Sequence, residues 1–533
     1  MKDLVRAYAR EEDGSLLIFA VYVFVLILMV GGIGVDLMRF ERDRADLQYT
    51  LDRAVLAAAD LDQTLDPSAV VADYLSKAGL GDSLASVSVS EGLGFRAVTA
   101  SATAEVRTQF MHMTGIDVLD APATSAAEER IDGIEISLVL DVSGSMNSNS
   151  RLTNLKSAGR DFIDNMVDNT QDGKLSISII PYATQVSTPA AFLDEFNVSD
   201  EHEYSNCVNF ESSDFSNTGI NTGQDLERTM HFSPWGNGDG RDNSPKELVN
   251  YPVCDDRTSR EMLIMQKDRN TLKNFITNLS AWGNTSIDLG MKWGTALLDQ
   301  SVQPVITELI SDGLVSSDFS QRPHAYDSDE TLKVVVLMTD GQNTSQYYIE
   351  DDFRTGDSDV WWNDVQQHYS VYYSGYSAYF WPHTGQWADH PYGLNGYGCI
   401  WNNGWNCGNQ NQPGESARLS YADLWAYTSL QANVEDNYEP WMNDNQAWNE
   451  WYYDVYGSVG SSTKNSRTNS ICSAAKDQGI IVFTIGFEAP SSGQTVLKNC
   501  ASSASHYFDV DGLEISDAFV SIASSIRKLR LTQ

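Results

Sequence analysis

The beginning of the chain contains a continuous apolar run. Residues 16–35 are 20 consecutive uncharged positions, enough for a helix to cross a bilayer. Apolar residues then recur four positions apart between charged ones, at Leu47, Leu51, Val55 and Ala59. This spacing predicts that residues 36–62 continue the same helix, so that half of it lies in lipid and half projects. A signal peptide is the alternative, but the run exceeds a usual signal core and no Ala-x-Ala site follows it.

Beyond this helix the pattern changes twice. Pro67 begins a second, short helical pattern that continues to about residue 78. From residue 83 to 108, apolar and polar residues alternate, which predicts a small antiparallel sheet. We expect residues 111–129 to form a connector with one further short strand.

From residue 134 onward, strand-like apolar runs are separated by helical patterns. The expected strands are 134–140, 174–181, 332–340, 480–485 and 507–510, with a short antiparallel strand near 185–188. The expected helices are 152–167, 269–280, 287–300, 465–478 and 514–530. Strands that alternate with helices pair in parallel through crossovers, so we predict an α/β fold with a doubly wound, mostly parallel sheet.

Two polar insertions interrupt this pattern, at about 193–260 and 346–460. The second contains ten of the thirteen tryptophans. Because it follows the strand end at Asp340, we expect it on that rim of the sheet, and the first insertion on the opposite rim. Most of its aromatic residues are expected to build a small core of their own. Contact with a partner surface and stacking on sugar rings are the alternative uses.

Acidic residues outnumber basic ones, 73 to 35, which gives a net charge of −38. Phosphate binding needs clustered lysine and arginine, so this balance excludes nucleic acid as a partner. It also disfavours contact with an anionic membrane surface. The acidity suits a soluble domain in a cation-rich extracytoplasmic setting.

All six cysteines lie after residue 200, on one side of the apolar run. They show neither CxxC nor the Cys/His spacing of a zinc site. An even number on one side of a membrane span favours disulfides in an oxidising compartment. Proximity along the chain suggests three pairs, Cys207–Cys254, Cys399–Cys407 and Cys472–Cys500. Free, buried cysteines in a cytosolic protein are the alternative.

Candidate metal chemistry lies at two strand ends and in one loop. The three segments are Asp141-Val142-Ser143-Gly144-Ser145, Gly283-Asn284-Thr285 and Thr339-Asp340-Gly341. Open α/β sheets bind their ligands at the carboxyl ends of strands. Two carboxylates and three hydroxyls are hard oxygen donors, suited to Mg²⁺ or Mn²⁺ and able to hold Ca²⁺. Taken singly, each segment is also an ordinary helix cap or turn.

The order Asp-x-Ser-x-Ser, distal Thr, distal Asp resembles the metal-ion-dependent adhesion site of von Willebrand factor A domains. The resemblance implies that Ser143, Ser145 and Thr285 ligate the cation directly. It places Asp141 and Asp340 near the cation, often through water. One coordination position would remain open for a carboxylate from a protein partner.

The N-terminal region resembles the TadE/TadG-like proteins of bacterial tight-adherence (Tad, Flp-type) pilus systems, in which a pilin-like start precedes an A domain. The similar segments are Gly14-Ser15-Leu16-Leu17, Gly34-Val35-Asp36 and Leu51-Asp52-Arg53-Ala54. The resemblance implies a cytoplasmic N-terminus and transmembrane helix over 1–35, a TadE/TadG-like helix and small sheet over 36–130, and an A domain over 133–530.

Five positions after Gly14 stands Phe19, where a processed pilin carries an acidic residue. We therefore expect permanent, single-pass anchoring in the bacterial inner membrane, with the C-terminal domain periplasmic or surface-exposed.

Together these features predict a non-enzymatic, membrane-anchored adhesion or assembly component that binds pilus or envelope proteins through a divalent cation. A metal-dependent hydrolase is disfavoured, because the chain has no Walker A loop, His-Glu-x-x-His or Gly-x-Ser-x-Gly motif. A third interpretation is a structural envelope protein in which the cation only stabilises the A domain.

Overall fold

The computed structural model describes residues 13–60, 63–92, 95–130, 133–328 and 331–529. The chain divides into two compact units, residues 1–132 with 525–533 and residues 133–524. Residues 1–12 of the expected cytoplasmic N-terminus, and the expected helix ends at 61–62 and 530, lie outside the described residues.

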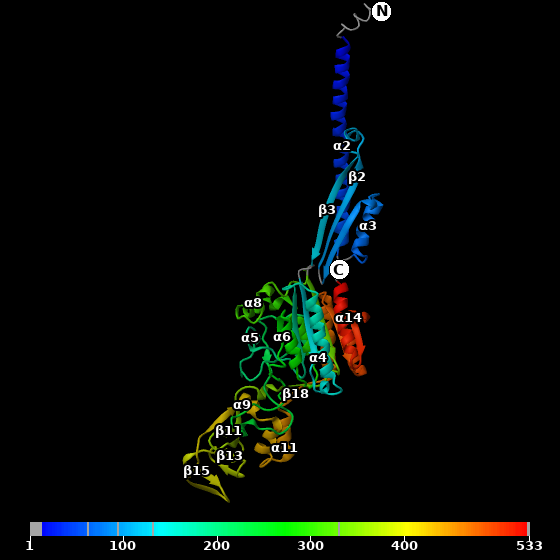
Figure 1. Cartoon of the computed structure of the whole chain (residues 1–533). Helices are drawn as coiled ribbons and strands as arrows, with labels where there is room; N and C mark the ends of the chain where they lie inside the picture. Colours follow the sequence, from blue (N-terminus) through cyan, green and yellow to red (C-terminus); the bar gives the residue numbers. More distant parts are fainter. Residues whose placement is uncertain (1–12, 61–62, 93–94, 131–132, 329–330, 530–533) are drawn as a thin grey trace, which may run out of the picture. The chain divides into compact units, whose positions relative to one another are not determined.

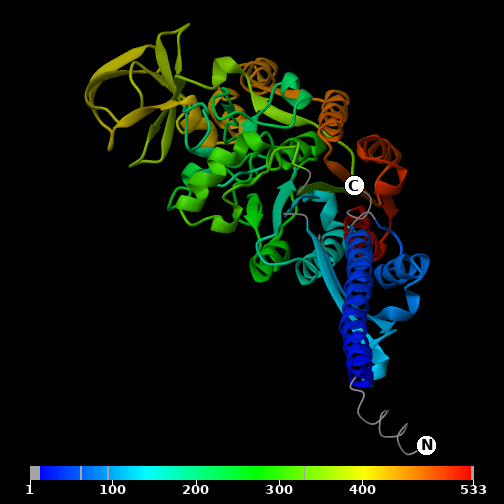
Figure 2. The ribbon, with the colours of Figure 1, turned by 90° about the horizontal axis from the view of Figure 1, so that it is seen from above.

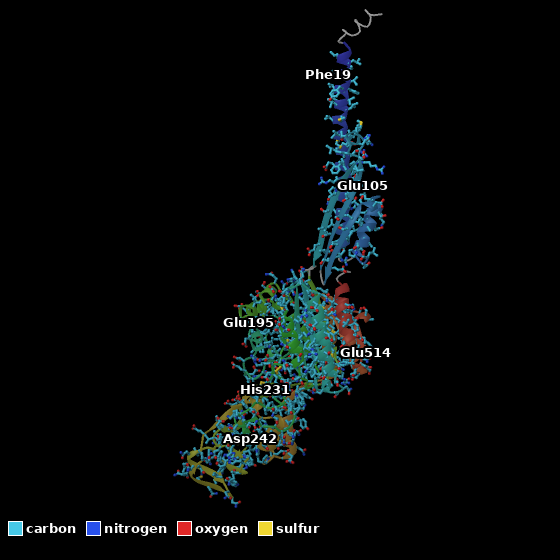
Figure 3. The ribbon with its side chains drawn as sticks, viewed as in Figure 1. Phe19, Glu105, Glu195, His231, Asp242 and Glu514 are labelled. Carbon is cyan, nitrogen blue, oxygen red and sulfur yellow. A yellow bond between two sulfur atoms is a disulfide. The ribbon has the colours of Figure 1, made fainter. Side chains whose placement is uncertain are left out.

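A helix of 47 residues, α2 (Asp13–Ala59), is the longest element of the first unit (Figure 1). By length and composition its apolar part could cross a membrane, as no other helix of the described residues could. Phe19 lies in this apolar part (Figure 3). The later part of α2 buries Leu47, Leu51 and Val55 in the core of the unit. The predicted single long helix is therefore confirmed.

The rest of the first unit is one helix and one sheet. They comprise α3 (Pro67–Lys77) and the antiparallel strands β1 (Leu84–Gly92), β2 (Phe95–Arg107) and β3 (Val118–Arg130), in the order β1-β2-β3. The further strand predicted within residues 111–129 is present but is longer than expected, because β3 has 13 residues and pairs with β2 throughout. Its buried side chains are small, Ala121 and Ala123, so they gave only a weak apolar signal.

Asp36 and Gly32 hold the loop between β2 and β3 on α2. The Asp36 carboxylate accepts the backbone N–H groups of residues 109–111, at 2.9, 2.7 and 2.7 Å. A Cβ at Gly32 would lie 2.5 Å from Cγ of Phe110, so only glycine allows this ring to approach the helix backbone. The other two glycines of the apolar run face open space.

Six strands form the central sheet of the second unit, in the order β20-β19-β9-β4-β5-β8. They are β4 (Gly133–Asp141), β5 (Leu175–Tyr182), β8 (Leu263–Gln266), β9 (Thr331–Thr339), β19 (Ile481–Phe487) and β20 (Tyr507–Val510). Five are parallel, and β8 is antiparallel at one edge. Every residue of β4 is buried, so helices and loops cover both faces of the sheet.

The helices of this unit form two packed groups. The first consists of α4 (Arg151–Asp168), α6 (Arg269–Asn278) and α14 (Glu514–Leu529). The second consists of α7 (Ile287–Ala296), α12 (Ser461–Asp477) and α13 (Ser491–Cys500), while α8 (Gln303–Ser311) contributes to the same core. Helices α8 and α13 are additional to the predicted set, and α7 ends at Ala296 instead of residue 300.

The predicted antiparallel strand near residues 185–188 is wrong. These residues form a buried loop with a single bridge, between Ser187 and Glu261, and the antiparallel edge strand is β8. The loop is tied to the first insertion by Gln185, whose Nε2 donates to Asn209 Oδ1 at 3.0 Å.

The first insertion therefore leaves the sheet after β5 and returns into the antiparallel β8 at the same rim. The prediction that it lies on the opposite rim is wrong for this reason: no strand carries the chain across before it. It contains α5 (Ala190–Leu193), β6 (Val208–Asn209) and β7 (Glu227–Arg228).

The second insertion begins with a two-stranded stem, β10 (Gln346–Ile349) paired with β18 (Tyr456–Val459). It holds a seven-stranded antiparallel sheet in the order β16-β15-β14-β13-β12-β11-β17. These strands are β11 (Asp357–Asn363), β12 (His368–Tyr373), β13 (Ala378–Trp381), β14 (Gln386–Ala388), β15 (Asn395–Trp401), β16 (Trp405–Asn411) and β17 (Ser416–Ser420). Short helices α9 (Tyr421–Tyr427), α10 (Leu430–Ala432) and α11 (Asp444–Trp448) follow. In Figure 1 this sheet, in yellow, lies next to the short helices α9 and α11 of the same insertion, and Figure 2 shows the same yellow strands from above.

The two insertions share one hydrophobic core. Met230, Phe232 and Val253 of the first insertion pack with buried residues of the second, among them Trp362 and Trp425. The prediction that most aromatic residues of the second insertion build a core is confirmed for these two tryptophans and for Trp381, which is also buried. The three predicted disulfides, Cys207–Cys254, Cys399–Cys407 and Cys472–Cys500, are all present.

Candidate metal centre

The candidate centre lies at the carboxyl ends of β4 and β9, which are adjacent and parallel. Asp141 is the last residue of β4, and Asp340 follows the last residue of β9. From β4 the chain builds one half of the sheet through β5 and β8 and the other half through β9, β19 and β20. The centre thus lies where the chain changes direction across the sheet, which is the usual ligand position in open α/β sheets.

Hydrogen bonds connect four of the five predicted residues. The buried Asp141 carboxylate accepts the backbone N–H of Ser143 at 2.8 Å. Ser145 Oγ donates to Asp340 Oδ1 at 2.6 Å and lies 3.1 Å from Ser143 Oγ. Thr339, which the sequence analysis did not select, donates from Oγ1 to Asp141 Oδ2 at 2.6 Å. Residues almost 200 positions apart therefore share one small polar cluster.

The Thr285 loop joins this cluster through its backbone. Gly144 N–H donates to the Gly283 carbonyl at 2.9 Å, which ties the loop to the serine segment. Thr285 N–H donates to Thr344 Oγ1 at 2.8 Å, which ties it to the segment after Asp340. A Cβ at Gly341 would lie 3.7 Å from Thr285 Oγ1, so this hydroxyl is close to the Asp340 turn. The structure thus brings all three predicted segments together.

The two carboxylates carry more negative charge than the protein neutralises. Burial and the neighbouring Asp340 raise the pKa of Asp141 to about 7. Burial also raises the pKa of Asp340. Arg151 Nη1 contacts Asp340 Oδ2 at 2.9 Å, but its Nε contacts Glu488 Oε2 at the same distance, so its charge is shared.

The donor set fits a small divalent cation. Within the described ranges no three His, Cys, Asp or Glu side chains cluster as a metal site, so a cation here would need other oxygen donors beside the two carboxylates, and the cluster offers hydroxyls. The five residues offer two carboxylates and three hydroxyls, the hard donors that Mg²⁺ prefers. A cation beside Asp141 and Asp340 would also offset the mutual repulsion that raises the pKa of Asp141.

Lys464 of α12 holds the Thr285 loop by hydrogen bonds, a role that the sequence did not predict. Its fully buried Nζ donates to the Thr285 carbonyl at 2.9 Å, the Thr344 carbonyl at 2.7 Å and Ser286 Oγ at 2.6 Å. Burial lowers the pKa of Lys464 to about 8. The spacing along the sequence could have indicated that Lys464 is buried. Lys464, Thr468, Ile471 and Ala475 share one face of α12, and all four are buried.

Arg260 plays a similar part on the other side of the serine segment. Its Nη2 donates to the Trp282 carbonyl at 2.9 Å, and the residue is almost completely buried. Burial lowers the pKa of Arg260 to about 10, and the negative charges of Asp255 and, more weakly, Asp141 act in the opposite direction. No local motif indicates this role, because Arg260 lies within the first insertion.

The stem of the second insertion begins at the rim of the centre. Asn284 Nδ2 donates to the Ser345 carbonyl at 2.7 Å, immediately before β10. Ser145 is exposed, whereas Asp141, Thr285 and Asp340 are buried. The cluster is therefore open to solvent on the Ser145 side, and both insertions leave the sheet at this rim.

Comparison with known proteins identifies one family segment. Residues 14–61 match the family described as putative Flp pilus-assembly TadE/G-like. This match supports a pilus-related role and, with the apolar α2 helix, a membrane-anchored protein. No curated protein matches the chain.

Three solved structures are among those similar to the chain, each at a low TM-score. The vWF domain of the type V pili tip protein Mfa5 from Porphyromonas gingivalis is 13% identical, with a TM-score of 0.31 over 74% of this chain and 95% of that one. Pilus adhesin SpaC from Lactobacillus rhamnosus GG is 13% identical, with a TM-score of 0.30 over 83% and 33%. The PilB minor pilin from Streptococcus sanguinis is 13% identical, with a TM-score of 0.29 over 84% and 78%. At these TM-scores the similarity carries no argument about fold or function.

Proposed function

We propose that the second unit is a von Willebrand factor A domain that holds one divalent cation, Mg²⁺ or else Mn²⁺ or Ca²⁺. The strand order supports this assignment. Numbered along the chain, the six strands of the central sheet follow the order 3-2-1-4-5-6 of a doubly wound fold, with the third strand antiparallel. Ser143, Ser145 and Thr285 would ligate the cation, with Asp141 and Asp340 beside it.

One observation carries the proposal. Two buried carboxylates and the serine hydroxyls lie within one hydrogen-bonded cluster, although they come from segments almost 200 residues apart. This cluster lies where the chain changes direction across the sheet. Neutral hydroxyl ligands leave most of the positive charge of a bound cation uncompensated, so the cation can still attract an anionic group. The protein keeps the acidic side chains buried and the Ser145 side exposed, so a partner's carboxylate can approach from solvent.

The N-terminal family match and the apolar α2 helix support the biological setting. We infer a permanently anchored component of a tight-adherence pilus system in a bacterial inner membrane, with residues 133–530 in the periplasm or at the surface. Its partner would be a pilus or envelope protein that offers an aspartate or glutamate. The proposed role is non-enzymatic.

A capture experiment tests this function. The full chain, immobilised from detergent, should retain purified pili of its own bacterium in Mg²⁺ and release them in EDTA. Asp141→Ala should abolish capture. Asp509→Ala, which removes an exposed carboxylate at the end of β20, is the matched control and should bind normally. Capture that survives both EDTA and Asp141→Ala would show that no metal bridge is involved, and would favour a cation that only stabilises the fold.

A further inference from the structure

The seven-stranded sheet of the second insertion carries an aromatic hollow that the metal centre does not use. It has a volume of about 590 Å³ and is lined by Gly375, Tyr376, Ala378, Trp387, Trp401 and Trp405. Four aromatic rings therefore form its walls, and the two small residues, glycine and alanine, form the rest of its lining. A volume of this size is typical of sites for small ligands.

Three of the four rings of the hollow are exposed, unlike the core aromatics of the same sheet, and Trp387 is half-buried. Trp401 and Trp405 are 47% and 48% exposed, and Tyr376 is 67% exposed. Two edge-to-face pairs make the walls: Trp401 with Trp405 at 5.7 Å and Tyr376 with Trp387 at 5.1 Å between centroids. Exposing so much apolar ring surface is costly in water, so such a group marks a contact site.

The indole N–H groups support the same conclusion. Five of the ten tryptophans in the insertion donate to protein acceptors: Trp362, Trp381, Trp425, Trp441 and Trp448. Within the described part of the chain, the three tryptophans of the hollow have no such acceptor. Their N–H groups are free to donate to a ligand.

The segment around the hollow is uncharged in a strongly acidic protein. Residues 390–414, which include β15 and β16, contain no Asp, Glu, Lys or Arg, although the whole chain carries −38. They contain six asparagines and two glutamines instead. Amide side chains donate and accept hydrogen bonds without preferring either charge, so the surface suits a neutral ligand with many hydroxyl groups.

The hairpin that carries two of the rings is held in one register. Cys399 lies opposite Cys407, and the two form a disulfide, while Trp401 lies opposite Trp405 at the end of the hairpin. Rings fixed in advance lose little freedom when a ligand binds, which favours affinity for weakly binding ligands.

We propose that this hollow binds a neutral oligosaccharide. The C–H bonds on the face of a pyranose ring carry partial positive charge and pack on the negative face of an aromatic ring. The hydroxyl groups around the sugar can accept from the indole N–H groups and exchange hydrogen bonds with the surrounding amides. An anionic ligand finds no lysine or arginine within residues 390–414, and the net charge of the protein repels it.

Titration of the full chain with defined sugars tests this proposal. The protein is kept in a detergent without a sugar headgroup and titrated with cellohexaose, chitohexaose and mannohexaose, and with hexagalacturonate as the anionic comparison. Calorimetry and tryptophan fluorescence report binding. At least one neutral hexasaccharide should bind, and Trp401→Ala or Trp405→Ala should weaken it by about tenfold or more. Tyr453→Ala, which removes another exposed ring, should leave affinity unchanged, as should EDTA.

Several results would overturn the proposal. The first is that none of the three neutral sugars binds at about 1 mM. The second is that hexagalacturonate binds more strongly than the neutral sugars. The third is that neutral-sugar binding persists in the Trp401→Ala/Trp405→Ala double variant. Sugar binding lost in EDTA would place the site at the metal centre instead. If the double variant loses pilus capture and no sugar binds, the hollow is a protein-docking surface. Near-UV circular dichroism and unfolding by urea establish that the variants are folded.

Discussion

Replacing Asp141 by asparagine should change how stability depends on pH and on Mg²⁺. The Asp141 carboxylate accepts a backbone N–H and the Thr339 hydroxyl. Asparagine keeps the size of the side chain and one acceptor, and its NH₂ can donate to the Thr339 hydroxyl oxygen. The substitution therefore removes a buried charge with little change in packing.

The structure sets the size of the effect. The pKa of Asp141 is about 7 in the folded, metal-free protein, against 3.8 as the ordinary value. A difference of this size is worth about 4 kcal/mol. Because the folded pKa is the higher one, stability from this group is fully present below pH 3.8 and is lost as pH rises through about 7. In EDTA, the free energy of unfolding of Asp141→Asn relative to wild type should therefore rise by about 3 kcal/mol between pH 5 and 8.

Urea unfolding at several pH values measures this difference. All thirteen tryptophans lie in the second unit, so their fluorescence reports that unit alone. A cation needs the ionised carboxylates, so Mg²⁺ should stabilise the wild type more at pH 8 than at pH 5 and should not stabilise Asp141→Asn. Asp509→Asn, at an exposed position, is the control. A stability difference that stays constant with pH, or equal stabilisation of Asp141→Asn by Mg²⁺, would refute the reasoning.

Three further predictions concern other parts of the chain. Lys464→Met leaves two carbonyls and a hydroxyl without their donor, so it should lower the free energy of unfolding by about 3 kcal/mol and weaken Mg²⁺ binding. The control Lys476→Met, on the same helix, should lower the free energy of unfolding by less than about 1 kcal/mol. Equal effects of the two variants would refute the role of buried Lys464 in holding the Thr285 loop. Replacing Cys207 and Cys254 by serine opens a loop of 47 residues and should cost about 4 kcal/mol in urea unfolding; a loss below about 1 kcal/mol would contradict this. Asp36→Asn weakens the acceptor for three successive N–H groups, so amide exchange at residues 109–111 should accelerate, corresponding to about 2 kcal/mol; unchanged protection there would disprove the anchoring role of Asp36.

Local patterns predicted the elements that depend on local physics. The apolar run and the four-residue repeat specified α2, and the long apolar runs specified β4 and β9, because strands buried on both faces lack polar positions. The edge strand β8 has only four residues, too few for a clear pattern. Strand β3 was underestimated because it buries alanines, whose small side chains give a weak apolar signal.

The metal-centre candidates were found because each lies at the end of a recognisable strand or in a short motif. Lys464 and Arg260, in contrast, reach the centre from segments whose positions follow only from tertiary packing. The placement of the first insertion failed for a related reason. Its exit rim depended on the direction of one short strand, and that strand lies after the insertion, not before it.

The most direct test of the account is where a cation binds. Crystals of the full chain soaked in Mn²⁺ should give one anomalous peak at the ends of β4 and β9, bonded to the hydroxyls of Ser143, Ser145 and Thr285 and next to Asp141 and Asp340. The peak should vanish in Asp141→Ala. A Mn²⁺ peak elsewhere, with none at these five side chains, would contradict the central claim.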